Sequence, residues 1–289
     1  MTRHFLTGAE LRPDELERLV ERAIELKADR LVSRALAGKS VALVFDLPST
    51  RTRVSFETGV YELGGHPLVL REGELQLSRG ESPRDTALVL SRMVQAIAIR
   101  TRSHETVEAL ARHGSVPVIN MLTREHHPCQ ALADLLTLRE RFGRLEGLKL
   151  AYVGDGNNMA RSLVRLGTMA GVEVVLSSPP QFALADVDSV PLEEAVRGAH
   201  ALYTDVWVSM GDDEAAINHK RTLLAAYRLD EELLAHAEDE AIVLHCLPAH
   251  PGEEITEGLL YGERSAVWDQ AENRLHAQKA LLELLLVGY

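Results

Sequence analysis

Cysteine is scarce in this sequence: its 289 residues include only Cys129 and Cys246. Two cysteines exclude a disulfide-rich scaffold and are typical of a reducing compartment. Long apolar runs are also missing, since the longest, at residues 281–287, is interrupted by Glu283 and is far shorter than the ~18 residues of a membrane span. The N-terminal segment MTRHFLTGAEL lacks the apolar stretch of a signal peptide. We therefore expect a cytoplasmic protein that does not span a membrane.

Basic residues are outnumbered by acidic ones, 31 against 43, which gives a formal net charge of −12. This balance disfavours long-range attraction to nucleic acid or to an anionic membrane. An anion could therefore be held only by a local pocket. At ~150 residues per domain, the chain length predicts two domains.

Short apolar runs alternate with amphipathic helical patterns along the chain. The strand-like run at residues 41–45 precedes a helical pattern at about 51–63, and the same alternation restarts near Leu148. Alternation of this kind is typical of parallel βαβ units. The sequence predicts two α/β domains joined near residues 126–147, with a final helix at about 271–287.

The segment STRTR, residues 49–53, places hydroxyl and guanidinium donors between a strand and a helix. Free backbone N–H groups at a helix N-terminus favour an anion. Ser49 or Thr50 could simply cap the helix. Capping does not account for Arg51 and Arg53, because cations oppose the helix dipole at this end. A phosphate site is therefore favoured here over a solvated surface.

Polar residues gather again in REHHPCQ, residues 124–130, after another strand. Adjacent histidines and a His-x-Cys spacing seldom converge on one tetrahedral ion, and the sequence has no matching CxxC or HxxxH. Pro128 suits the first turn of a helix. A neutral histidine with Gln130 could instead polarise a carbonyl, while helix capping is the simpler alternative.

The segment VGDGNNMA, residues 153–160, has part of a dinucleotide fingerprint. Met159 occupies the position of the third glycine, so the match is weak. Asn157 and Asn158 offer amide hydrogen bonds at a strand end, although turn chemistry alone could explain them.

Three further segments carry polar residues near predicted strand ends. Asp205 begins DVWVSMG, which opens a polar loop running to about Leu223, a length more typical of a functional loop than of a simple connection. Cys246, in HCLPA, could equally be a buried core thiol. Arg274 lies near the start of the final helix, as an anion ligand or as a surface residue.

Together, STRTR, HPCQ, GDGNN, DVWVSMG and HCLPA follow the order and spacing of the aspartate/ornithine transcarbamylase family. The pairing of DVWVSMG with HCLP resembles the ornithine carbamoyltransferases in particular. This resemblance implies carbamoyl transfer from carbamoyl phosphate to the δ-amine of L-ornithine, giving citrulline in arginine metabolism. It implies two doubly wound domains with parallel sheets: residues 1–135 together with helix 271–289, which packs back on this domain, and residues 136–270. It also implies a homotrimer or an assembly of trimers, and neither a metal nor an organic cofactor.

The resemblance also assigns site residues. Four residues are implied in catalysis: Arg100, His127, Asp205 and Cys246. A larger set is implied in binding carbamoyl phosphate: Ser49, Thr50, Arg51, Thr52, Gln76 from a neighbouring subunit, Arg100, His127, Pro128, Cys129, Gln130, Cys246, Leu247 and Arg274. Four residues are implied in binding ornithine: Asn158, Asp205, Ser209 and Met210.

The sequence departs from the family pattern at two positions. Leu47 precedes STRTR where relatives often have lysine, and Pro251 stands where bacterial relatives often have arginine. Neither departure removes an implied site residue, so we expect activity with altered kinetics. Two other classes of function remain open from the residues alone: a nucleotide-dependent oxidoreductase built on GDGNN, and a non-catalytic module that binds an anion or an amino acid.

Overall fold

The computed structural model describes residues 2–75, 80–208 and 214–288. The chain divides into two compact units: unit 1 is Met1–Leu136 with Glu272–Tyr289, and unit 2 is Thr137–Ala271. Among the described residues, no helix has both the length and the apolar character needed to cross a membrane.

Unit 1 is built on a four-stranded parallel sheet with the strand order β2-β1-β3-β4. The strands are β1 (Ser40–Phe45), β2 (His66–Arg71), β3 (Ala96–Arg100) and β4 (Val118–Leu122). The helical elements are α1 (Pro13–Ala28), α2 (Thr50–Glu62), η1 (Glu72–Glu74), α3 (Pro83–Leu90), α4 (His104–His113) and the start of α5 (Pro128–Phe142).

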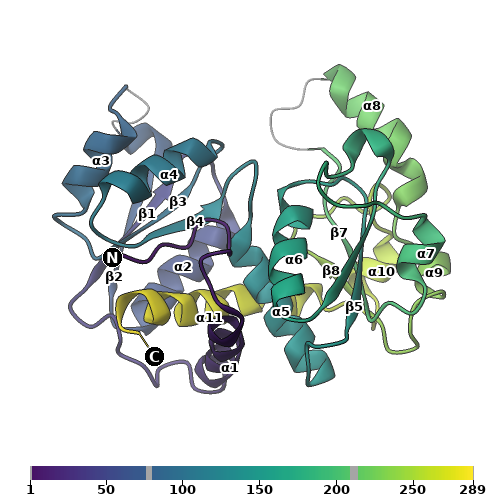
Figure 1. Ribbon diagram of the computed structural model, residues 1–289, viewed down its shortest axis with the longest axis horizontal. Coiled ribbons are helices and arrows are strands. Elements are labelled where there is room, and N and C mark those ends of the chain that lie inside the picture. The colour runs from purple at the N-terminus through teal and green to yellow at the C-terminus, as the bar shows by residue number, and fades with distance from the viewer. Residues whose placement is uncertain (1, 76–79, 209–213, 289) are drawn as a thin grey trace. The chain divides into compact units, whose positions relative to one another are not determined.

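Both faces of this sheet are covered, as an almost fully apolar parallel sheet requires. On one face, Ala42 and Ile97 pack in a cluster with Ala87 of α3 and with Val107 and Leu110 of α4. Helices α1 and α2 lie on the other face (Figure 1). A side-chain cap begins each of three helices, with Ser49, Ser82 and Ser103 at the N-caps of α2, α3 and α4.

The final helix, α11 (Val267–Leu286), starts in unit 2 and joins unit 1 from Glu272 onward. Its fully buried Lys279 donates to Glu62 Oε2 of α2 at 2.9 Å and to the Arg30 carbonyl at 2.5 Å. Glu283 accepts from Arg22 of α1 at 2.7 Å. These contacts confirm that the last helix packs on the first domain, and the helix begins at Val267 rather than near residue 271.

Unit 2 repeats the architecture with a parallel sheet of order β6-β5-β7-β8. Its strands are β5 (Lys149–Val153), β6 (Glu173–Ser177), β7 (Ala201–Thr204) and β8 (Ile242–His245). The remaining elements are α6 (Asn158–Met169), η3 (Pro180–Phe182), α7 (Leu192–Val196), α8 (Glu214–Leu224), η4 (Ala225–Tyr227), α9 (Glu231–Leu234) and α10 (Glu257–Tyr261). Two parallel α/β sheets with flanking helices confirm the predicted fold class.

The predicted loop from Asp205 to about Leu223 is wrong in its second half, which forms α8. Polar contacts hold this helix: Lys220 Nζ donates to Asp155 at 2.9 Å, and Arg221 donates to Glu253 at 2.7 Å. These charged residues give the segment the polar character from which a loop was predicted.

The strand order opens a crevice at one point in each sheet. From β1 the chain moves outward to β2 and then returns to the other side of β1 as β3; β5, β6 and β7 repeat this path. The loops that follow the two central strands therefore diverge, and parallel sheets bind ligands at such points, at the carboxyl ends of the strands. Candidate residues should lie after β1 and β3 in unit 1, and after β5 and β7 in unit 2.

We expect Lys279→Met to lower the free energy of unfolding by about 1–3 kcal/mol, because it removes one of the two cations that pair with the buried Glu62, and Arg30 remains. The double variant Lys279→Met/Glu62→Gln should recover part of this loss. Arg18 forms an exposed ion pair with Asp14, and Arg18→Met should cost less than about 1 kcal/mol. Urea unfolding of the parent protein and the three variants measures these differences. Equal losses of stability in Lys279→Met and Arg18→Met would show that the buried ion pair contributes no more than an exposed one.

Candidate active site

The STRTR segment forms the N-terminus of α2 at the carboxyl edge of the unit 1 sheet. Ser49 is the N-cap: its Oγ accepts from Thr52 N at 3.3 Å, and its hydroxyl donates to Thr52 Oγ1 at 3.0 Å. Thr50 is the exposed first residue of the helix. The capping interpretation is therefore right for Ser49, while Thr52 is buried and faces other polar groups.

The two arginines of this segment have different surroundings. Arg53 lies on the surface, where its Nε donates to Glu57 Oε2 at 3.0 Å one helical turn away. Arg51 Nε is buried and finds no hydrogen-bond acceptor among the residues that the structure describes. Burying a donor without an acceptor is costly, so Arg51 is suited to bind an anion. Arg53 instead forms an ion pair with Glu57 of the same helix.

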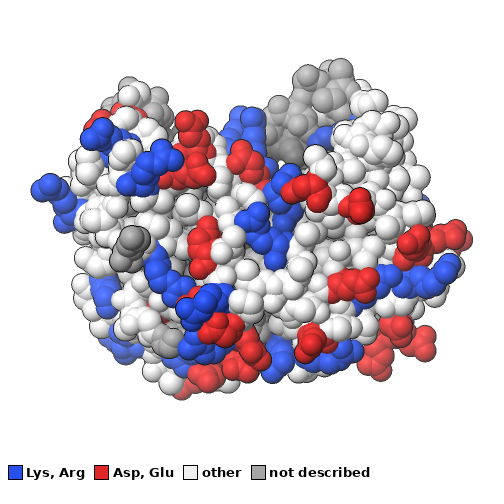
Figure 2. All heavy atoms as spheres, viewed as in Figure 1, with Lys and Arg blue, Asp and Glu red and all other residues white. Residues whose placement is uncertain are grey.

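A third guanidinium comes from the final helix. Arg274 is 3% exposed, and its Nη2 donates to Thr52 Oγ1 at 2.6 Å. Thr52 Oγ1 thus accepts from both Ser49 and Arg274, which leaves its own O–H proton to donate elsewhere. Figure 2 shows acidic and basic side chains interspersed over the drawn face.

His127 lies among these cations, where α5 begins. Burial, followed by the charges of Arg274, Arg100 and Arg51, holds the pKa of His127 well below its usual value. Arg100 is the last residue of β3, so three separate segments bring guanidinium groups to this one imidazole. The imidazole is neutral at pH 7, and the cluster has a surplus of positive charge that suits an anionic ligand.

The first turn of α5 adds an amide and a thiol. Gln130 is 1% exposed; its Nε2 donates to Asp134 at 2.9 Å, and its buried Oε1 accepts no hydrogen bond from the described part of the chain. Cys129 is fully buried, and its Sγ donates to the Asn120 carbonyl at 3.3 Å. Burial raises the pKa of Cys129 to about 12, so its thiol belongs to the core. Pro128 is the first residue of the helix, as predicted.

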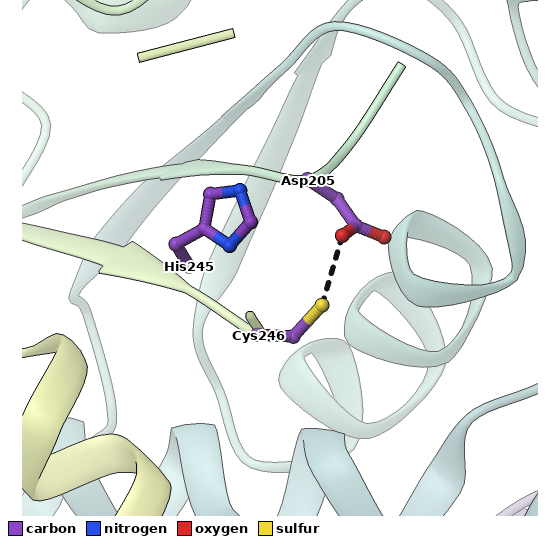
Figure 3. Close-up of side chains that lie close together, drawn as sticks. All are labelled: Asp205, His245 and Cys246. Carbon is purple, nitrogen blue, oxygen red and sulfur yellow. Dashed lines mark hydrogen bonds between the residues drawn. The ribbon is translucent and has the colours of Figure 1, made fainter. Parts of the chain in front are cut away.

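In unit 2, the carboxylate of Asp205 is the centre of a hydrogen-bonded group at the end of β7. Its Oδ2 accepts from Asn157 Nδ2 at 2.7 Å, and its Oδ1 accepts from Val206 N at 2.8 Å and from Cys246 Sγ at 2.9 Å. Figure 3 shows Cys246 and Asp205 pointing toward each other from the ends of neighbouring strands. Cys246, which the resemblance assigns to carbamoyl phosphate, therefore contacts the residue assigned to ornithine.

His245 has its ring nitrogens engaged away from this carboxylate. Its Nδ1 accepts from Leu247 N at 2.8 Å, and its Nε2 lies 3.1 Å from Glu254 Oε1. Burial favours the neutral form of Glu254, but hydrogen bonds from His245 and from the His250 backbone outweigh it, so the pKa of Glu254 is lowered. Leu247 has a φ of +59°, a strained value for a residue with a Cβ, and its hydrogen bond to His245 helps to hold it.

Two groups of side chains in the described part of the chain have potential metal-ligand atoms within 4.8 Å of one another: Asp205 with His245 and Cys246, and His250 with Glu253 and Glu254. A metal-binding histidine needs a free ring lone pair. With Nδ1 accepting from the Leu247 N–H, the tautomer assigned to His245 carries its proton on Nε2, facing Glu254. The first group therefore fits a hydrogen-bonded cluster better than an ion site.

The glycines of GDGNN serve packing inside unit 2. A Cβ on Gly156 would lie 2.4 Å from the Phe182 carbonyl oxygen, and Gly154 has a φ of +124° with Trp207 beside it. In a dinucleotide fingerprint, the second glycine, at the position of Gly156, allows the pyrophosphate to approach the backbone. Here the backbone near Phe182 occupies that space, which disfavours the oxidoreductase alternative.

Comparisons with known proteins cover almost the entire chain. Residues 3–140 match the profile of the aspartate/ornithine carbamoyltransferase carbamoyl-P binding domain, and residues 146–285 match that of the Asp/Orn binding domain. The chain belongs to the aspartate/ornithine carbamoyltransferase family.

Individual members of the aspartate/ornithine carbamoyltransferase family are similar over their full length. An ornithine carbamoyltransferase of Acidothermus cellulolyticus is 51% identical, and the match covers 99% of this chain and 97% of the relative. The structure of an ornithine carbamoyltransferase from Pyrococcus furiosus superposes with a TM-score of 0.93 at 42% identity, covering 99% of this chain and 98% of that one. The structure of an ornithine carbamoyltransferase from Thermus thermophilus superposes with a TM-score of 0.91 at 43% identity, and the match covers 99% of this chain and 99% of that one.

Three of the site residues that the resemblance implies lie outside the described part of the chain. A fourth lies next to the residue that bonds to Asp205. Gln76, Ser209 and Met210 fall outside the described residues. Asn158 is the half-buried first residue of α6, whereas its neighbour Asn157 bonds to Asp205. The GNN motif alone could not distinguish the two amides, although an asparagine immediately before a helical pattern is a signal for an N-cap.

The lowered pKa of His127 gives a testable pH dependence. As pH falls below ~6.5, the unfolded chain protonates this histidine before the folded protein does, so stability contributed by the neutral form is lost. His127→Asn should therefore lose less stability than the parent protein between pH 7.5 and 5.5. The difference should approach about 1.4 kcal/mol per pH unit below 6.5. Urea unfolding at both pH values measures it, and parallel losses in the two proteins would contradict it.

Proposed function

We propose that this chain is an ornithine carbamoyltransferase. It transfers the carbamoyl group of carbamoyl phosphate to the δ-amine of L-ornithine, and it releases L-citrulline and phosphate. The observation that carries the proposal is the set of three arginines around a neutral, buried His127, within the segment that matches a carbamoyl-phosphate-binding domain.

The phosphate group of the substrate is held by Arg51 and by the N-terminus of α2. Guanidinium groups bind phosphate oxygens in a planar, bidentate manner and keep their charge at every working pH. The buried Arg51 Nε supports this role, because a bound phosphate would give it an acceptor. The Ser49 and Thr50 side chains and the free N–H groups of the helix add neutral donors.

The carbamoyl group is polarised by Arg100, His127 and Thr52. A neutral imidazole can donate one N–H to the carbonyl oxygen without giving up the proton, and each well-placed donor contributes roughly 3–4 kcal/mol to stabilising the developing negative charge. The Gln130 Oε1 atom, which is buried and lacks a donor among the described residues, suits the N–H groups of the carbamoyl amide. Attack by the amine forms the C–N bond, expulsion of phosphate breaks the C–O bond, and the proton lost by the attacking nitrogen passes to the leaving phosphate.

The nucleophile must be a neutral amine. An alkyl ammonium has a pKa of ~10.4, so freeing its lone pair at pH 7 costs about 4.6 kcal/mol. The cations around carbamoyl phosphate disfavour a second positive charge at the reacting nitrogen, which lowers this cost. Asp205 binds the α-ammonium instead, so that the two amino groups of ornithine are distinguished by their electrostatic surroundings.

Asp205 also supports ornithine over related substrates. An enzyme specific for aspartate would need cations where this carboxylate lies, because it has to bind a second carboxylate. An N-acetylated ornithine would leave the buried Asp205 without an ammonium partner, which costs several kcal/mol. Cys246 supports the carboxylate through its S–H group.

We further propose that the protein acts as a cytoplasmic homotrimer in arginine biosynthesis. Exposed apolar side chains on and just after α3 support association between copies, because exposed apolar groups favour burial in an interface. They include Leu88, Val89 and Met93, which are 45%, 49% and 68% exposed.

A panel of amines tests the reaction. With carbamoyl phosphate present, we expect colorimetric detection of citrulline from L-ornithine, and no carbamoylated product from lysine, putrescine or aspartate above a few per cent of that rate. Carbamoylation of aspartate would overturn the assignment of substrate. Saturable binding of ornithine without any citrulline would instead indicate the non-catalytic binding module.

Two variants separate the roles of the two units. Arg51→Met should raise the KM for carbamoyl phosphate by about tenfold or more, and Asp205→Asn should lower kcat/KM for ornithine by about tenfold to a hundredfold, because each change removes a charge-assisted hydrogen bond. Arg53→Met is the matched control for Arg51→Met, since Arg53 pairs with Glu57 on the surface. Steady-state kinetics measure all three, and a loss below tenfold for Asp205→Asn would contradict its role.

A further inference from the structure

Asn157 connects the two loops that diverge at the crevice of the unit 2 sheet. It follows β5 in the loop before α6, and its Nδ2 donates to Asp205 Oδ2, after β7, at 2.7 Å. These two strands are neighbours in the sheet, and the chain changes direction between them. The hydrogen bond therefore joins the two loops close to the strand ends from which they diverge.

The orientation of the Asn157 amide is fixed by two backbone donors on its other side: its Oδ1 accepts from Met159 N at 2.8 Å and from Ala160 N at 3.3 Å. The Tyr152 hydroxyl lies 3.1 Å from the same oxygen and shares its one proton between it and the Asp155 carbonyl at 3.0 Å. Backbone N–H groups can only donate, so the oxygen must face them and the NH₂ group must face Asp205. Tyr152 is fully buried on β5, and burial, reinforced by the charges of Asp205 and Asp155, raises its pKa well above the usual value, which keeps it a donor.

Counting acceptor sites on Asp205 shows what this arrangement leaves open. A carboxylate oxygen offers about two lone-pair directions. Oδ1 uses both, for Val206 N and Cys246 Sγ, whereas Oδ2 uses one, for Asn157. Among the partners that the described residues provide, one direction on Oδ2 is then left for a ligand, and Asn157 determines where it points.

We propose that Asn157 is a positioning residue for the substrate amino acid: it holds the Asp205 carboxylate so that one lone pair of Oδ2 receives the α-ammonium. This inference rests on the proposed function. Helix capping explains only the acceptor Oδ1, because serine, threonine or aspartate would cap α6 as well. The Nδ2 donor, which capping does not need, is the atom that acts on Asp205.

The variant Asn157→Asp separates the two roles. Its carboxylate still accepts from Met159 N and Ala160 N, so α6 keeps its cap, but it faces Asp205 with a negative charge in place of an N–H donor. Asp230→Ala is the control for cap loss in the same unit, because Asp230 caps α9 through Leu233 N. Melting temperatures of all three proteins report the structural effect.

Ornithine kinetics and a non-reacting probe report the positioning effect. L-norvaline keeps the α-ammonium and α-carboxylate of ornithine and lacks the δ-amine, so calorimetric titration with it measures binding without turnover. For Asn157→Asp we expect the KM for ornithine and the Kd for norvaline to rise by about tenfold to a hundredfold. The KM for carbamoyl phosphate should stay within about twofold, because this residue does not belong to the arginine cluster.

The pH dependence gives a sharper test. Two facing carboxylates share a proton more readily than either alone binds one, and the protonated pair again has a donor in place of the amide. The deficit of Asn157→Asp in norvaline affinity, relative to the parent protein, should therefore shrink as pH falls from 8 to 5. Asp230→Ala should lower the melting temperature without a change in either KM.

The outcomes distinguish this inference from the proposed function. If the parent protein makes citrulline and Asn157→Asp matches it within twofold in both norvaline Kd and ornithine KM, the inference is wrong and the function stands. An equal rise in both substrate KM values with a lowered melting temperature would also overturn it, since that pattern indicates general damage. A parent protein that neither makes citrulline nor binds norvaline would remove the function on which the inference rests.

Discussion

The order of strands in the two sheets is the constraint on which the rest of the structure depends. Each unit places its first strand at the centre and then adds one strand on each side, so the loops after two neighbouring strands part. In unit 1 the parting loops are joined by Thr101 Oγ1, which donates to Asp46 Oδ2 at 2.8 Å. In unit 2 they are joined by Asn157 and Asp205. The candidate residues of each unit therefore lie at the carboxyl ends of strands in a parallel sheet.

The two units use opposite charges on these similar scaffolds. Unit 1 gathers Arg51, Arg100 and Arg274 around an imidazole that stays neutral, an arrangement that an anionic ligand would stabilise. Unit 2 presents the carboxylate of Asp205, supported by an amide, a backbone N–H and a thiol. A substrate pair in which one molecule is an anion and the other has an ammonium group satisfies both.

Much of the fold could be predicted because it depends on patterns of local sequence. Alternating strand and helix signals predicted the two parallel sheets, and hydroxyl residues before helices predicted caps such as Ser49. The helix α8 was missed because its segment was interpreted as part of a polar loop, whereas its Lys220 and Arg221 form ion pairs that hold it. The short helices α9 and α10 were likewise not predicted.

The candidate site was less predictable than the fold, because it depends on which way single side chains point. Arg51 and Arg53 are equivalent in sequence, yet one is turned inward and the other pairs with Glu57. Asn157 and Asn158 are adjacent amides, and only the three-dimensional loop decides which reaches Asp205. Motif spacing predicted which segments carry the candidate residues, whereas the contacts of the individual side chains required coordinates.

The path of α11 also has a consequence for how the chain folds during synthesis. Thr52 and Glu62 lie early in the sequence, but their partners Arg274 and Lys279 are separated from them by 222 and 217 residues. Domains that are continuous in sequence can fold as they leave the ribosome. Unit 1 is not continuous: until the last helix has been translated, Thr52 lacks its contact with Arg274, and Glu62 lacks its contact with Lys279 and is paired with Arg30. Unit 2, which is made in between, is continuous in sequence and is the first unit whose whole chain is available for cotranslational folding.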